Sequence, residues 1–181
     1  MKHRFWHGFL IFICSLSVLA FAEGGSFEKI KMQAEDGNAQ AQFKLGIMYF
    51  YGQETAQNYK EALKWFQKAA EQELPEAQCN TGLMYYEGKG VPQNLTEALK
   101  WFNKVAKQNN PKAQYNLGVM YSLGEGVPQD YIKSYIWFSL AYSNGFEQAK
   151  SKILLLNKVM TAFEMENAAA QAAEMKKNLK K

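Results

Sequence analysis

Apolar residues between positions 41 and 70 recur with the spacing of α-helices. In the first segment they fall at i, i+4, i+7 and i+8, at Ala41, Leu45, Met48 and Tyr49. This spacing places the four side chains on one face of a helix. After a polar stretch the same kind of stripe is formed by Tyr59, Ala62, Leu63, Phe66, Ala69 and Ala70. The pattern therefore predicts two amphipathic helices joined by a loop.

This helix pair occurs three times, at a period of 36 residues. The hexapeptide EALKWF stands at 61–66 and again at 97–102. Shifting the chain by one period aligns AQFKLGIMYFYG, AQCNTGLMYYEG and AQYNLGVMYSLG without a gap. One glycine and one tryptophan recur in every unit, at Gly46, Gly82 and Gly118 and at Trp65, Trp101 and Trp137. A fixed period of this length is typical of solenoids built from helix pairs, so we predict an all-α solenoid.

The connection inside each unit carries helix-stop signals. The second and third units have GKGVPQ at 88–93 and GEGVPQ at 124–129. Glycine can adopt the left-handed conformation that ends a helix, and proline prevents its continuation. Asn94 and Asp130 then stand where a helix N-cap is expected. The first unit has QETA at 53–56 instead, so we expect its loop to be looser.

The recurring glycine and tryptophan need a structural reason. A glycine inside a helix costs about 1 kcal/mol relative to alanine. We therefore expect the backbone of a partner helix to pass close to Gly46, Gly82 and Gly118. A tryptophan that recurs once per unit forms either the core between repeats or a platform for a ligand, and we favour the core.

The first residues have the organisation of a secretory signal peptide. Lys2 and Arg4 precede an apolar run at 9–19, and the alanine-phenylalanine-alanine that follows is the pattern that signal peptidase cleaves. The run is too short for a membrane span, which needs about 20 residues. We therefore predict a signal peptide over 1–22 that is cleaved after Ala22. An uncleaved membrane anchor is the alternative.

The rest of the chain divides according to the period. We expect an N-terminal capping helix that is half a repeat at 23–38, three repeats at 39–74, 75–110 and 111–146, and a partial repeat with a C-terminal capping helix and a lysine-rich tail at 147–181. Thr161 and Glu164 have the spacing of a capping box that opens the last helix. We expect that helix to cover the apolar end of the stack.

Cleavage would change the composition in a way that excludes several functions. His3 and His7 are the only histidines, and Arg4 is the only arginine. Without histidine the mature chain has no Ser-His-Asp or Cys-His pair and no imidazole ligand, so we expect no metal, no cofactor and no enzyme activity. Loss of Lys2 and Arg4 lowers the net charge of +4 by two, which argues against a nucleic-acid partner. The S-x-x-K pattern at 26–29 lacks the companion motifs of penicillin-recognising enzymes.

Cysteine usage leaves a single thiol. Cys14 lies inside the predicted signal peptide, so only Cys79 remains and no internal disulfide can form. Cys79 is either a buried, inert thiol or a link between two chains, and we favour the buried thiol. A Cys79-linked dimer, or an oligomer built through the ends of the stack, is the alternative.

The pattern A-x-x-x-L-G-x-M-Y, followed by G-x-G-V-P-Q and A-x-x-W-F, resembles the Sel-1-like repeat, a relative of the tetratricopeptide repeat. The resemblance covers about 39–149. It implies an α/α superhelical solenoid of antiparallel helix pairs that acts as a non-catalytic scaffold or adaptor and holds a peptide or protein partner in a concave groove. It also implies work in the bacterial envelope, where the protein would regulate a periplasmic sensor, support an envelope complex or contact a host protein.

The resemblance also sets the expected location and one alternative function. We expect a periplasmic protein with no membrane span after cleavage, and release from the cell is the alternative. A hydrolase acting on β-lactams or peptidoglycan is the alternative function, by analogy with the cysteine-rich branch of the family. That branch closes each unit with a pair of cysteines, which Cys79 alone cannot form. The analogy therefore transfers poorly to this chain.

The first helices of related repeats line the concave surface, and here a second stripe runs beside their core stripe. It comprises Phe43, Ile47, Phe50, Cys79, Leu83, Tyr86, Tyr115, Val119 and Ser122. A polar row runs next to it at Lys44, Asn80 and Asn116, and asparagine amides can both donate to and accept from a peptide backbone. For Ile47, Leu83 and Val119 we favour packing between units. The candidate binding residues are Phe43, Lys44, Phe50, Asn80, Tyr86, Tyr115 and Asn116.

Overall fold

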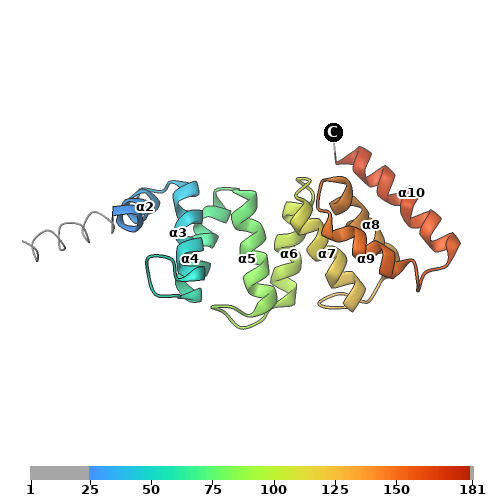
Figure 1. The fold of residues 1–181 in the computed structure, drawn as a ribbon, viewed down its shortest axis with the longest axis horizontal. Helices are drawn as coiled ribbons and strands as arrows, with labels where there is room; N and C mark the ends of the chain where they lie inside the picture. The colour runs from blue at the N-terminus through green and yellow to red at the C-terminus, as the bar shows by residue number, and fades with distance from the viewer. Residues whose placement is uncertain (1–24, 180–181) are drawn as a thin grey trace, which may run out of the picture.

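The computed structural model describes residues 25–179, and every regular element in that part of the chain is a helix (Figure 1). The helices are α2 (Gly25–Glu35), α3 (Ala39–Tyr51), α4 (Tyr59–Glu71), α5 (Pro75–Glu87), α6 (Leu95–Ala106), α7 (Pro111–Leu123), α8 (Tyr131–Ser143), α9 (Gln148–Leu156) and α10 (Ala162–Asn178). They form one elongated row, from α2 at one end to α9 and α10 at the other (Figure 1). The predicted all-α solenoid is confirmed, whereas the predicted signal peptide lies outside the described residues.

Helices pair within each unit and then stack on the next unit. α3 packs on α4, α5 on α6 and α7 on α8, while α4 contacts α5 and α6 contacts α7. In α4 the apolar stripe, including Leu63 and Phe66, is buried, and Lys60, Lys64 and Lys68 are exposed on the opposite side. Helices of this length are marginal in isolation, so their stability comes from burying each stripe against neighbours on both sides.

The three loops inside the repeats follow the same path, although the first has a different sequence. A glycine in the left-handed conformation ends each first helix, with φ 69° at Gly52, 67° at Gly88 and 73° at Gly124. The N-cap residue of each second helix then donates its N–H to the first helix, as Asn58 does to the Tyr49 carbonyl at 2.8 Å. The first loop makes the same backbone bonds as the others, but polar Thr55 stands where Val91 and Val127 pack on the core in the later loops. The looser first loop stays a prediction, because these bonds define the path of the loop and not its mobility.

Glu54 replaces the second glycine of this loop in the first unit. It has a φ of 57°, and its Oε2 accepts a hydrogen bond from the N–H of Phe27 in α2 at 3.1 Å. At the same place in the second unit, Gly90 lies so close to the backbone of Tyr59 in α4 that a Cβ atom would clash. The loop of each of these units therefore rests on the start of the preceding second helix.

The recurring glycine in each first helix faces a phenylalanine ring. The three pairs are Gly46–Phe66, Gly82–Phe102 and Gly118–Phe138. A Cβ atom on the glycine would stand 2.6 to 2.9 Å from the nearest ring atom of its partner. Each phenylalanine belongs to the second helix of the same unit and is fully buried. The expected close approach exists, but a side chain makes it rather than a helix backbone, because the ring fills the space that the missing Cβ leaves.

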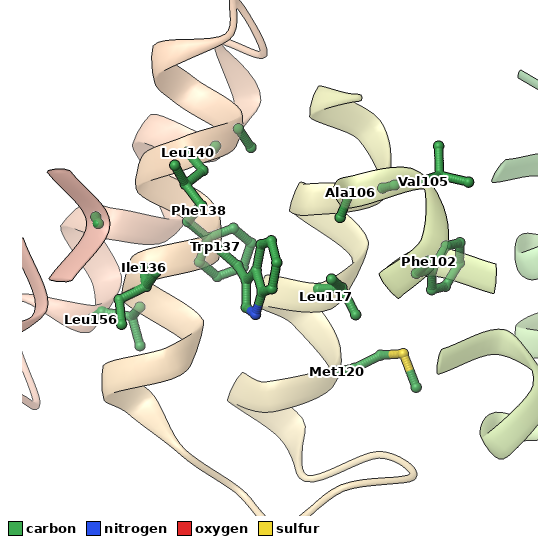
Figure 2. Packing of buried hydrophobic residues seen from close by; sticks show 14 of the residues in the cluster. Phe102, Val105, Ala106, Leu117, Met120, Ile136, Trp137, Phe138, Leu140 and Leu156 are labelled. Carbon is green, nitrogen blue, oxygen red and sulfur yellow. The ribbon is translucent and has the colours of Figure 1, made fainter. Parts of the chain in front are cut away.

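The tryptophans contribute to the core both within a unit and between successive units. Trp65 and Trp137 are buried, and Trp101 is half-buried. Trp65 shares a buried cluster with Ile30 of α2, so it joins its own unit to the helix before it. Figure 2 shows Trp137 directed from α8 toward Leu117 of α7, within the largest cluster of buried side chains.

One buried glutamine per repeat also ties successive units together. Gln78 Nε2 donates to the Ala70 carbonyl at 3.0 Å, and Gln114 Nε2 donates to the Ala106 carbonyl at 3.1 Å. Gln42 makes the equivalent bond in the first unit. Each bond supplies a donor to the C-terminal end of the preceding second helix, where carbonyl groups lack intrahelical partners. This role was not predicted, although the glutamine recurs in the AQ dipeptide of each unit.

The last helix packs on α8 rather than pairing with α9. Ala168 and Ala172 of α10 are buried in that contact, and the predicted capping box is present at Thr161 and Glu164. Leu154 stands where the other first helices carry glycine, so a phenylalanine ring cannot approach α9 in the same way. Large apolar side chains therefore stay exposed at this end, at Leu154, Leu155, Val159 and Phe163. The predicted closure of the end by α10 is incomplete.

Candidate binding groove

Two hollows lie beside the first helices at the N-terminal end of the row. A cavity of about 440 Å³ lies between α2 and α3, and its lining includes Phe43, Lys44 and Ile47. A smaller cavity of about 60 Å³ lies between α3 and α5, where Ile47 faces Asn80 and Leu83. We name this surface the first-helix groove. Its members are Phe43, Lys44, Ile47, Phe50, Asn80, Leu83 and Tyr86, together with the α7 equivalents Tyr115, Asn116 and Val119.

The polar row supplies the groups that are free to bind. Lys44 is exposed, and Asn80 and Asn116 are half-buried. Other asparagines are engaged, since Asn103 and Asn109 each donate to a backbone carbonyl group, at 2.9 and 3.0 Å. Within residues 25–179 the side chains of Asn80 and Asn116 have no hydrogen-bond partner. Two amides spaced by one repeat are therefore available on the same face.

Phe43 and Tyr115 pack in part against the core. The ring of Phe43 lies 5.7 Å from that of Phe66, and the ring of Tyr115 lies 5.3 Å from that of Phe138. Tyr115 also contacts Phe146, which follows α8, with ring centroids 5.0 Å apart. Both residues are half-buried, so they present only part of each ring to the groove.

Phe50 and Tyr86 are covered by the loop of the following unit. The Lys89 ammonium group lies 5.0 Å from the centroid of the Phe50 ring, and the Tyr86 hydroxyl group donates to Glu125 Oε2. Burial, followed by this hydrogen bond and the charge of Glu125, raises the pKa of Tyr86 to about 12. These two candidate residues thus already have partners within the chain.

Cys79 is buried beneath the groove. Its exposed fraction is 6%, and burial raises the pKa of its thiol to about 11, with Lys112 opposing the shift and Glu76 adding to it. A shielded, protonated thiol is a poor nucleophile. This geometry supports the interpretation of Cys79 as a buried, inert thiol, and it gives no support to a dimer linked through Cys79.

Two exposed apolar residues at the rim of the groove were not predicted. Tyr51 and Leu123 end α3 and α7, with exposed fractions of 64% and 59%. They occupy the same position in the first and third units, where Glu87 stands in the second. Their recurrence at two periods was the available signal. The helical stripes alone do not identify such residues, because they do not show which face the next unit covers.

The described residues offer no assembled catalytic or metal site of the kinds considered above. Among residues 25–179, no group of three or more histidine, cysteine, aspartate or glutamate side chains could hold a metal ion. Ser26 and Lys29 are both exposed on α2 rather than set in a cleft. No helix in this part of the chain is long and apolar enough to cross a membrane.

A row of helix pairs in which each unit packs on the next defines a helical repeat solenoid. The model of the Sel1 repeat matches residues 39–74, 75–110 and 111–146, which is more than half of the chain. The protein therefore belongs to the Sel1 repeat family. Repeats of this family commonly form scaffolds for protein partners and are generally not catalytic.

Similar sequences occur in much longer proteins. Over 44 residues, 24% of this chain, it is 43% identical to the secretory immunoglobulin A-binding protein EsiB of Escherichia coli O6:H1. Over 45 residues, 25% of this chain, it is 42% identical to a sel1-like repeat-containing protein of Acanthamoeba polyphaga mimivirus. These matches cover 9% and 8% of the two relatives, so the chain matches only a small part of their length.

Solved structures share the fold over most of this chain. A protective antigen of uropathogenic Escherichia coli with an SLR fold is similar with a TM-score of 0.71 and 37% identity, over 82% of this chain and 33% of that one. A Sel1 repeat protein from Oxalobacter formigenes is similar with a TM-score of 0.66 and 30% identity, over 76% of this chain and 58% of that one.

Proposed function

We propose that this protein is a non-catalytic scaffold that holds a protein or peptide partner in the first-helix groove. The observation that carries the proposal is the pair of amides at Asn80 and Asn116. They are half-buried, lack partners within residues 25–179 and recur at one repeat spacing on one face. Each amide can donate to and accept from a backbone, so the two together suit an extended segment or a helix lying across the first helices.

The partner is proposed to be an envelope or host protein. Residues 1–22 have the pattern of a signal peptide, which supports export and a periplasmic location, with release from the cell as a second destination. Of two similar proteins, one is named for binding secretory immunoglobulin A and the other is described as a protective antigen. A sensor or complex of the envelope is the other class of partner that an exported scaffold would serve.

Site-specific photo-crosslinking tests the proposal in the native envelope. A photoreactive amino acid is placed at Asn80 or Asn116 and, as a matched control, at Lys64 or Lys100, which are exposed on the second helices α4 and α6. We expect one protein, identified by mass spectrometry, to be captured from the two groove positions and not from the controls. Equal capture from all four positions would contradict the groove assignment.

A turnover assay tests whether the protein is non-catalytic. Purified protein is incubated with nitrocefin and with muropeptides, the substrates of the hydrolase alternative. We expect no turnover above a heat-denatured control. Sustained turnover of either substrate would overturn the proposal of a non-catalytic protein.

A further inference from the structure

The polar row of the first-helix groove ends in a lysine on both sides. Shifting the chain by one period places four residues in one column: Lys44, Asn80, Asn116 and Lys152. The two central members are the unpartnered amides, and the outer two are cations. The column therefore combines groups that bind a backbone with groups that bind carboxylates.

Lys152 belongs to this column because α9 keeps the register of the earlier first helices. Ala149 and Leu156 are buried on α9, one period after Ala113 and Met120, which are buried on α7. α9 also packs on α8 as α7 packs on α6. Lys152 therefore faces the same side of the row as Asn116.

The groove has an excess of free positive charge. Within residues 25–179, Lys44, Lys112 and Lys152 make no ion pair. Lys112 lies close enough to Cys79 in the groove wall to lower the pKa of its thiol, as Glu76 lies close enough to raise it. Glu76 makes no ion pair with any described residue, so it offsets one of the three lysines.

Two further acidic residues, Glu87 and Glu125, lie on this side of the row, and of these two only Glu87 is in an ion pair within the described part of the chain. Glu87 pairs with Lys89 at 2.8 Å, and Glu125 accepts the hydrogen bond of Tyr86. On the second helices Lys64 pairs with Glu61 at 3.4 Å and Lys100 with Glu97 at 2.6 Å. Lys60 and Lys68 of α4 make no ion pair with any residue in 25–179. Lysines without an ion pair therefore occur on both sides of the row, but Lys44 and Lys152 are the ones that flank the unpartnered amides in the column.

We infer that the groove binds an extended acidic peptide segment, with its backbone on Asn80 and Asn116 and its carboxylates on Lys44 and Lys152. This inference rests on the proposed function and names the chemistry of its partner. The column crosses the four first helices α3, α5, α7 and α9, so a peptide that reaches both lysines must be extended.

Selection from a random library of ten-residue peptides tests this inference. The peptides are selected on the wild-type protein, on the groove variant Lys44→Ala/Lys152→Ala and on the control variant Lys64→Ala/Lys100→Ala. The control removes the same charge from the second helices. Thermal unfolding checks that all three proteins fold equally well, which is expected because these side chains are not buried.

We expect peptides selected on the wild type and the control to be at least about threefold richer in aspartate and glutamate than those selected on the groove variant. The affinity of the best acidic peptide should fall about tenfold in the groove variant and stay unchanged in the control. Asn80→Ala/Asn116→Ala should weaken acidic and neutral peptides alike. A selected pool without acidic enrichment, an enrichment that persists in the groove variant, or a failure to select any peptide would each overturn the inference.

The proposed function is judged separately, by photo-crosslinking at Asn80 and Asn116. If a partner is captured at these positions but the selected peptides lack acidic enrichment, the scaffold function is supported and the acidic preference is wrong. Absence of capture at both positions would overturn the scaffold proposal itself.

Discussion

The hydroxyl group of Tyr86 donates a hydrogen bond to a carboxylate oxygen of Glu125, which belongs to the loop of the following repeat. One period earlier, Lys89 occupies the position of Glu125 and places its ammonium group 5.0 Å from the ring of Phe50, the equivalent of Tyr86. The same contact between units is thus made once by a hydrogen bond and once by a cation–π interaction. A repeat can therefore keep a contact while its residues change.

Removing the Tyr86 hydroxyl group should weaken the contact between the second and third units. We expect Tyr86→Phe to lower the free energy of unfolding by about 1 kcal/mol, because Glu125 loses its only side-chain donor among the described residues. Urea unfolding measures the change. Tyr142→Phe is the matched control, since Tyr142 is exposed and should give no change. An equal effect of both substitutions would show that the bond contributes nothing.

The same contact should make stability depend on pH in the alkaline range. Burial and Glu125 raise the pKa of Tyr86 from 10.0 to about 12, so the folded state holds this proton more tightly than the unfolded state. The resulting stabilisation is complete below pH 10 and is lost as the pH rises toward 12. The difference in unfolding midpoint between wild type and Tyr86→Phe should therefore be smaller at pH 11 than at pH 8. A larger difference at pH 11 would contradict this sign.

The glycine in the first helix should not tolerate even a methyl group. A Cβ atom at Gly118 would stand 2.6 Å from the ring of Phe138, which is fully buried. We expect Gly118→Ala to destabilise the protein by about 1–2 kcal/mol, because overpacking outweighs the gain in helix propensity.

A double-mutant cycle separates the steric cause from other effects of that substitution. Phe138→Leu removes the ring and should itself be destabilising, since it leaves a cavity. In the Phe138→Leu background, Gly118→Ala should cost much less than in the wild type. Additive costs in the two backgrounds would mean that the ring is not the reason for the glycine.

The buried glutamines should differ in importance although they occupy the same position. Gln114 donates to the Ala106 carbonyl group and accepts from Asn144 Nδ2 at 2.9 Å. Gln78 makes only the donor bond, and its Oε1 atom has no partner within the described residues. We expect Gln114→Met to cost about 1 kcal/mol more than Gln78→Met in chemical unfolding. Equal costs would show that the second bond is not formed in solution.

The thiol of Cys79 should react slowly in the native protein. Because burial raises its pKa to about 11, little thiolate is present at pH 8. Labelling by Ellman's reagent should be at least about 100-fold slower in the native protein than in guanidinium-unfolded protein. Non-reducing gels should show a monomer. Rapid native labelling, or a dimer that reductant dissolves, would instead support Cys79 as a link between chains.

The repeated architecture was predictable because its signals are local. Apolar spacing identified the helices, and Asn94 and Asp130 marked the starts of two second helices, where their side chains accept bonds from backbone N–H groups. The recurrence of Gly82 and Trp101 pointed correctly to close packing. Helix stripes and N-caps depend on residues a few positions apart, and the period is visible when the chain is aligned with itself. A single sequence therefore contains all of these signals.

The candidate site was predictable only in outline. Periodicity placed Phe50 and Tyr86 on the groove face, but the structure shows the loop of the next unit covering both. A helical stripe shows which residues share a face, and it does not show what reaches that face from the following repeat. Asn80 and Asn116 are left as free polar groups, since within residues 25–179 their side chains make no hydrogen bond and are only half-buried.

The sequence by itself determined that this chain is a stack of helix pairs with a period of 36 residues, because helix formation and termination depend on neighbouring residues. Only the tertiary structure decided that a phenylalanine ring fills the place of each missing Cβ, that α10 packs on α8 and leaves α9 partly exposed, and which groove residues remain free. These outcomes depend on distances between residues that are far apart along the chain. Those distances are determined by side-chain volume and packing, and they cannot be inferred from the local pattern of apolar and polar residues.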